Sequence, residues 1–170
     1  DNKTPLAGKR ITAEACIHHL WFCDEDYERM GNFIKWNPSI KKRQDRDAIL
    51  KAVSDNYIDV IATDHAPHTI AEKNQLYIKA PSGGPLVQHS LVAMLEFYHQ
   101  RKISLEKIVA KMSHDVATCF RIEKRGFVRE GYFADLALVD LNKKWKVVKK
   151  NILAKCNWSP FQGTEFNSSV

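Results

Sequence analysis

The chain of 170 residues has the length of one ordinary domain and is short for a complete (β/α)8 barrel, which takes about 250 residues. Its composition, 44% hydrophobic and 27% charged, is that of a globular protein and excludes a disordered chain. No apolar run approaches the roughly 20 residues of a membrane span, and the four cysteines are too irregularly spaced to suggest a disulfide framework. The polar segment Asp1–Arg10 has no apolar signal-peptide core, so we expect a cytoplasmic protein with no membrane partner.

The net charge of +6 comes from one stretch of the sequence. Leu141–Lys155 contains six lysines and no acidic residue, so the rest of the chain is near neutral. The interleaved apolar residues predict a strand whose lysines face solvent, where lysines protect an exposed sheet edge. A patch for nucleic acid or a membrane is the alternative. No nucleic-acid-binding motif accompanies the lysines, and we expect no such partner.

The first regular element expected is a strand. Apolar and polar residues alternate along Ile11–Leu20. On a strand Cys16 and His18 would share a face and His19 would point away.

A helix and a second strand follow. Apolar residues at helical spacing predict a helix over Gln44–Asn56, with Asp45 as its N-cap. The β-branched run Ile58–Ala62 predicts a buried parallel strand. Thr63–Gly84, rich in proline and glycine, is expected to be a long irregular loop, a feature that is often functional.

The second half of the chain begins with helices and ends with strands. Pro85 suits the first turn of a helix, and Ser104 and Ser113 suit the caps of two more, ending near residues 112 and 122. The alternation after Gly126, with a turn at Gly131, predicts a small β unit.

Thr63–Thr69 is the densest cluster of chemical groups. Asp64, His65 and His68 follow the predicted strand Ile58–Ala62 directly, and ligands bind at the carboxyl ends of parallel strands. A carboxylate with two imidazoles offers a metal ligand and a general base. The alternative is a capping aspartate with surface histidines.

A second cluster, Cys16–Cys23, contains His18 and His19. It has no C-x2-C pair, so we do not expect a self-contained zinc knuckle. One imidazole lining a site at the strand's end is one interpretation, and a core histidine is the other.

Two further loops have suitable chemistry, although each alone is more typical of a plain turn. The amide of Asn37, in Asn37-Pro38, can both donate and accept hydrogen bonds. The glycines of Ala80-Pro-Ser-Gly-Gly84 allow a ligand to approach exposed backbone N–H and C=O groups.

In order and spacing these segments resemble the C-terminal part of the dihydroorotase family, in the cyclic amidohydrolase branch of the amidohydrolase superfamily. The segment of residues 61–69 is similar to that family's signature at barrel strand eight, and residues 14–20 to its strand-seven segment. Residues 80–83 and 131–140 are similar to its Ala-Pro-Phe-Gly loop and to the strand that follows the barrel. The Asn-Pro-Pro-Leu-Arg loop is matched only partly, because Ser39 and Lys41 replace its second proline and its arginine.

The resemblance implies a zinc-dependent enzyme, usually with two zinc ions, that interconverts dihydroorotate and N-carbamoyl-L-aspartate in pyrimidine biosynthesis. Asp64 would be a metal ligand and the catalytic acid/base. The substrate-binding residues implied are Asn37, His68, Ala80, Pro81 and Gly83. His18, His19 and His65 would contact other residues of the site rather than the substrate. The longer enzyme would be a homodimer.

For the fold, the resemblance implies an α/β chain formed by about the last two βα units of a (β/α)8 TIM-type metallohydrolase barrel, residues 1–125. A small β-sandwich segment, residues 126–170, would follow. The expected His-x-His pair and other ligands are absent from the sequence, so we expect an inactive fragment of a longer enzyme. Dihydropyrimidinase, allantoinase and a non-catalytic dihydroorotase-like partner of a transcarbamoylase remain alternatives.

Overall fold

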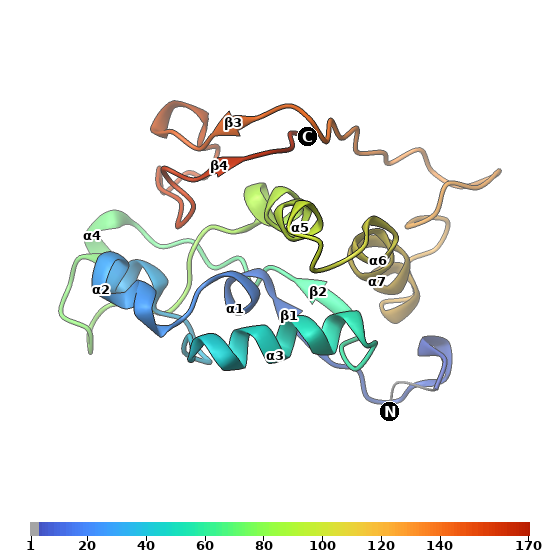
Figure 1. Cartoon of the computed structure of the whole chain (residues 1–170), viewed down its shortest axis with the longest axis horizontal. Coiled ribbons are helices and arrows are strands. Elements are labelled where there is room, and N and C mark those ends of the chain that lie inside the picture. Colours follow the sequence, from blue (N-terminus) through green and yellow to red (C-terminus); the bar gives the residue numbers. More distant parts are fainter. Residues whose placement is uncertain (1–3) are drawn as a thin grey trace.

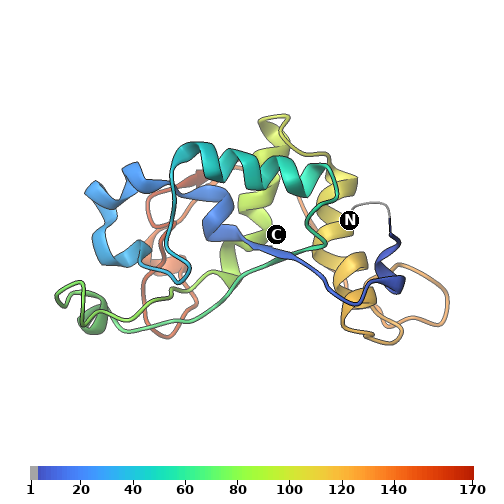
Figure 2. The same ribbon diagram turned by 90° about the horizontal axis from the view of Figure 1, so that it is seen from below.

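Two short parallel strands lie at the centre of the structure, a computed structural model that describes residues 4–170. Strand β1 (Glu14–Cys16) pairs with β2 (Val60–Ala62), and Ala15 is opposite Ile61. Helix α3 (Arg43–Ser54) lies on one side of the strands and α5 (Ser90–His99) on the other (Figure 1). Figure 2 shows the molecule from below, the side on which α3 lies, with α3 running alongside the strands.

The other helical elements are short, and most have a single turn. They are η1 (Leu6–Gly8), α1 (Ile17–Trp21), η2 (Asp24–Asp26), α2 (Tyr27–Met30), η3 (Gly31–Ile34), α4 (Ile70–Lys73), η4 (Val87–His89), α6 (Leu105–Val109), η5 (Ala110–His114), α7 (Asp115–Cys119) and η6 (Lys149–Asn151). No helix within residues 4–170 is long and apolar enough to cross a bilayer.

A second, antiparallel pair of strands packs on the far side of α5 (Figure 1). Trp145 of β3 (Trp145–Lys146) is opposite Phe166 of β4 (Glu165–Phe166). The rings of Phe161 and Phe166 lie 5.3 and 5.8 Å from the ring of Trp21 in α1, measured between centroids. Burial of these aromatic rings joins the C-terminal segment to the core that surrounds β1 and β2.

The predicted strand Ile11–Leu20 was too long. Its ladder ends at Cys16 and the chain turns into α1, whose Ile17 and Leu20 are fully buried. Burial of both side chains on one helical turn outweighs the alternation of the sequence. His18 and His19 therefore do not lie on opposite faces of a strand, and their ring centroids are 4.1 Å apart.

The helix caps required two corrections. The N-cap of α3 is Lys42, and Asp45 occupies the third helical position, where its carboxylate accepts a hydrogen bond from the Lys42 N–H at 3.1 Å. Ser104 caps α6 as predicted. Ser113 caps no helix, because the π-helical turn η5 makes α6 and α7 continuous.

Helix α5 begins at Ser90, after η4, so Pro85 is not in its first turn. The predicted loop Thr63–Gly84 contains the helical turn α4. Its start was signalled by Thr69 and Glu72, which form a reciprocal capping box.

The largest departure lies after Gly126. No strand ladder forms between residues 127 and 139 of the described chain, and the predicted turn at Gly131 joins no hairpin. The lysines of Leu141–Lys155, in contrast, are exposed as predicted, while Val147 between them is buried.

Candidate functional site

Asp64 occupies the carboxyl end of β2, where the sequence predicted it. Its φ of 46° is left-handed, a conformation that aspartate tolerates better than most residues. The side chain is exposed and makes no hydrogen bond or ion pair within residues 4–170. The carboxylate is therefore available to a ligand.

The two histidines that follow Asp64 hold neighbouring loops. The Nδ1 atom of His65 accepts hydrogen bonds from the N–H groups of Leu86 and Val87, at 3.1 and 3.2 Å, so the neutral ring carries its proton on Nε2. His68 Nε2 lies 3.0 Å from the carbonyl oxygen of Ser82 and donates to it. Both imidazoles connect the end of β2 to the chain after residue 81.

The Ala80–Gly84 loop approaches its surroundings too closely for a side chain at either glycine. A Cβ at Gly83, where φ is +120°, would lie 2.7 Å from Ala66. At Gly84 it would lie 2.9 Å from the Trp36 ring. The glycines were expected to allow close approach of a ligand, and in the structure they allow close approach of the chain itself.

Asn37 lies near this loop through its neighbours. The N–H of Gly83 donates to the carbonyl of Lys35 at 2.9 Å, and His19 Nε2 lies 2.8 Å from the carbonyl of Pro38. The Asn37 side chain is exposed and makes no hydrogen bond within the described residues. The structure thus connects the loops that carry Asn37, His68 and Ala80–Gly84, and it leaves the Asn37 amide and the Asp64 carboxylate free.

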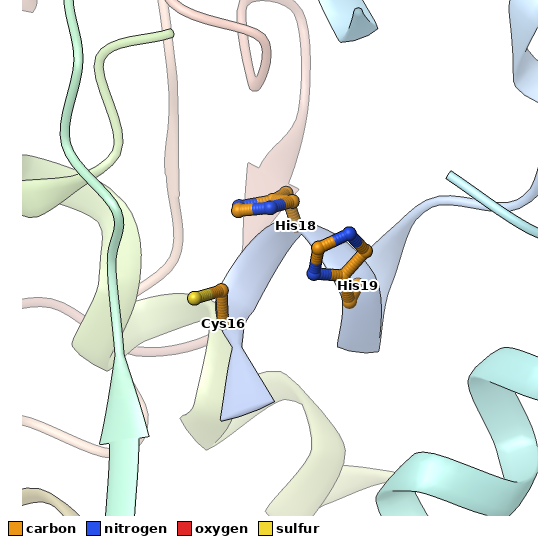
Figure 3. A group of neighbouring side chains, drawn as sticks. All are labelled: Cys16, His18 and His19. Atoms are coloured by element: carbon orange, nitrogen blue, oxygen red, sulfur yellow. The ribbon is translucent and has the colours of Figure 1, made fainter. Parts of the chain in front are cut away.

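Cys16, His18 and His19 form a compact group at the end of β1 (Figure 3). One ligand atom from each lies within 4.8 Å of the others. His18 is fully buried and stacks on Trp36 at 4.5 Å, and neither of its ring nitrogens has a hydrogen-bond partner among residues 4–170. Burial, and then the nearby His19, lowers the pKa of His18 to about 3.

The thiol of this group is not poised for reaction. Burial, with the charges of Glu14 and Asp64, raises the pKa of Cys16 to about 11, so the thiol keeps its proton at neutral pH. Within this group His18 is buried, while Cys16 and His19 are half-buried. His18 is a core histidine, and His19 supports the Asn37-Pro38 loop.

A metal ion requires more ligands than Asp64 supplies. Zinc sites use three or four protein ligands. Within residues 4–170 the two groupings of possible ligands are Cys16 with His18 and His19, and Cys23 with Asp24 and Glu25, and Asp64 belongs to neither. The described residues therefore do not by themselves fit a metal centre at Asp64.

Sequence comparison identifies the class of protein. The model of the amidohydrolase family matches residues 9–169, and the chain belongs to that family. Curated relatives named dihydroorotase include those of Halobacterium salinarum, 36% identical over 157 residues, and Bacillus caldolyticus, 38% identical over 160 residues. Each alignment covers 92% of this chain and 37% of the relative, so the chain spans little more than a third of these proteins.

The chain shares its fold with solved structures. The L-hydantoinase (dihydropyrimidinase) of Arthrobacter aurescens has a TM-score of 0.87 at 24% identity, over 95% of this chain and 37% of its own. The dihydroorotase of Saccharomyces cerevisiae, in complex with 5-fluoroorotic acid, has a TM-score of 0.78 at 18% identity, over 99% and 45%. The chain thus has an amidohydrolase-family fold, in a family whose members are generally metal-dependent.

Proposed function

We propose that the protein to which this chain belongs is a dihydroorotase, which hydrolyses dihydroorotate reversibly to N-carbamoyl-L-aspartate in pyrimidine biosynthesis. The observation that carries the proposal is the similarity to dihydroorotases, at 34–38% identity over more than nine tenths of the chain. The arrangement at the end of β2 is consistent with it, because the free Asp64 carboxylate lies at the strand end where α/β enzymes bind ligands.

Asp64 is the proposed acid/base. Hydrolysis of a cyclic amide requires a group that takes a proton from the attacking water and returns one to the departing nitrogen. An exposed carboxylate without an internal partner can do both, because no hydrogen bond must break before it reaches the substrate. We also propose Asp64 as one ligand of a zinc pair, whose other ligands would come from outside the described residues.

The proposed substrate contacts are Asn37, His68 and the backbone of Ala80, Pro81 and Gly83. Asn37 is supported by its free amide, which can contact a carboxylate or a ring N–H. His68 binds the Ser82 carbonyl through Nε2, so its influence on the substrate would come through the loop or through its other nitrogen. The substrate is a dianion when open, and Lys41, whose amine donates to Ser39 Oγ, supplies a nearby cation.

The proposed architecture assigns residues 1–125 to the last two βα units of a TIM-type barrel and residues 126–170 to part of a β-sandwich. The parallel pair β1–β2 supports the first assignment and the antiparallel pair β3–β4 supports the second. A cytoplasmic homodimer is the proposed state of the longer enzyme, and the piece alone is proposed to be inactive.

The test is a comparison of substrates with the longest protein that contains this chain, supplied with zinc. We expect turnover of N-carbamoyl-L-aspartate to exceed that of dihydrouracil and allantoin by orders of magnitude. Preference for dihydrouracil or allantoin would favour a dihydropyrimidinase or an allantoinase. No turnover of any of the three, by a folded protein that binds a transcarbamoylase, would indicate a non-catalytic partner.

A further inference from the structure

The backbone of the Ala80–Gly84 loop is held through its carbonyl groups. Five consecutive carbonyl oxygens each accept a hydrogen bond from elsewhere in the chain. The donors, in order, are Lys35 Nζ to Ala80 (2.6 Å), Lys73 Nζ to Pro81 (2.9 Å), His68 Nε2 to Ser82 (3.0 Å), Lys73 Nζ to Gly83 (2.8 Å) and Ala66 N to Gly84 (3.3 Å).

Lys73 is the one donor that binds two of these carbonyls. Its side chain is fully buried, and its ammonium also lies 3.4 Å from the carbonyl oxygen of Lys35. Three carbonyls from two segments thus match the three N–H donors of an ammonium. No carboxylate pairs with Lys73 in the described part of the chain, and the Trp158 ring lies 6.0 Å from the amine.

A buried charge with no opposite charge is unusual and costly unless its hydrogen bonds are complete. Burial, and then the charge of Lys35, lowers the pKa of Lys73 to about 8, which still leaves the amine mostly charged at pH 7. A methionine would fill the same space without desolvating a charge. The ammonium is therefore best explained by the carbonyls that it brings together.

The base of the side chain is fixed as well. Lys73 is the last residue of α4, and the capping box of Thr69 and Glu72 fixes the first turn of this helix. The Lys73 N–H bonds to the carbonyl of Thr69 at 3.1 Å. Helix α4 thus fixes the position of the Lys73 amine next to the loop.

We propose that Lys73 is a positioning residue, which holds the backbone of Ala80–Gly84 in the shape that binds substrate. The role of the loop in substrate binding rests on the function proposed above. The hold on the loop itself follows from the contacts of the ammonium and is testable without any activity.

The experiment compares Lys73→Met with Lys79→Met in the longest protein that contains this chain. Lys79 undergoes the same chemical change six residues later, close to the loop in sequence, but it is exposed and its amine makes no hydrogen bond in the described residues. We expect faster hydrogen–deuterium exchange of amides 76–84 in Lys73→Met, with exchange in α5 unchanged. In Lys79→Met both regions should exchange as in the wild type.

Kinetics provide the second measurement. We expect kcat/KM for N-carbamoyl-L-aspartate to fall on the order of 10²-fold in Lys73→Met, mainly through KM, because a displaced loop binds substrate less well. Lys73→Gln, which retains a neutral donor, should lie between Lys73→Met and the wild type, and it replaces Lys73→Met if that variant does not fold.

The outcomes separate the two proposals. Wild-type exchange of amides 76–84 in Lys73→Met, or in Lys73→Gln where that is the folded variant, overturns the hold of Lys73 on the loop. Faster exchange with unchanged KM overturns its role in substrate binding. If Lys73→Met exchanges faster but the wild-type protein turns over no carbamoyl-aspartate, the dihydroorotase proposal is contradicted. The hold of Lys73 on the loop is then still supported.

Discussion

The apolar side chain of Ala15 in β1 is buried, whereas most apolar side chains along residues 127–139 are exposed. Ala15 is 4% exposed, whereas Val128, Leu136 and Leu138 are 88%, 70% and 90% exposed. β1 has β2 as its ladder partner, while residues 127–139 pair with no strand of the described chain. The difference shows that an apolar pattern gives a strand only where a second strand can satisfy the backbone.

The largest expected effect concerns the chemistry at the end of β2, in the well-packed region. Asp64→Asn should lower kcat on the order of 10³-fold or more, because the amide cannot accept or return a proton. Stability should change little, since the Asp64 side chain has no hydrogen bond to lose within the part of the chain that the structure describes. Asp24→Asn, another exposed aspartate, is the matched control, and turnover of carbamoyl-aspartate is the measurement. Retained activity would remove Asp64 from the acid/base role.

A second change tests the packing of the C-terminal segment against the core. Phe161→Ala should lower the free energy of unfolding by about 3–5 kcal/mol, because the ring is fully buried against Trp21 and Phe166. Phe120→Ala removes a ring that is 64% exposed and should cost less than about 1 kcal/mol. Urea unfolding measures both. Equal losses would mean that β3 and β4 do not share the core.

The same interface should weaken in acid. Burial lowers the pKa of His89 to about 4, against 6.5 when exposed, so the unfolded state binds more protons between these values. Stability should therefore be full above pH 6.5 and fall by up to about 3 kcal/mol towards pH 4. Unfolding from pH 7 to pH 4 should show a shallower fall in His89→Phe than in His114→Phe. Parallel pH profiles would contradict the assignment.

The smallest effect is expected along residues 127–139. Leu138→Ser should change the free energy of unfolding by less than about 0.5 kcal/mol, because a leucine that is 90% exposed has little burial to lose. Val147→Ser, in the buried part of the lysine segment, serves as the contrasting variant and should cost several times more. A large loss at Leu138 would mean that a partner covers this segment in solution.

The sequence predicted several of the elements, and it placed Asp64 at the end of a buried strand, because local patterns carry that information. The strand Val60–Ala62 and the cap at Ser104 follow from spacing and cap chemistry, whereas the grouping of His68 with the Ala80–Gly84 loop was implied by the family resemblance. The turn from β1 into α1 was missed, because it depends on which side chains the core accepts rather than on alternation.

Lys73 was missed for a different reason. The capping box of Thr69 and Glu72 was visible in the sequence and would have located α4, and with it the final lysine. Nothing local distinguishes a lysine that will be buried, since its carbonyl acceptors belong to residues 35, 81 and 83. Such a role is set by tertiary contacts alone.

The burial of Lys73 also makes it a chemical reporter. An amine with no solvent exposure and three bound carbonyls is shielded from acylating reagents, whereas the exposed lysines of the segment 141–155 are open to them. Burial is the main cause of its lowered pKa, so once the loop opens the amine reacts as an ordinary exposed lysine. The rate at which Lys73 is acylated therefore reports how often the Ala80–Gly84 loop opens.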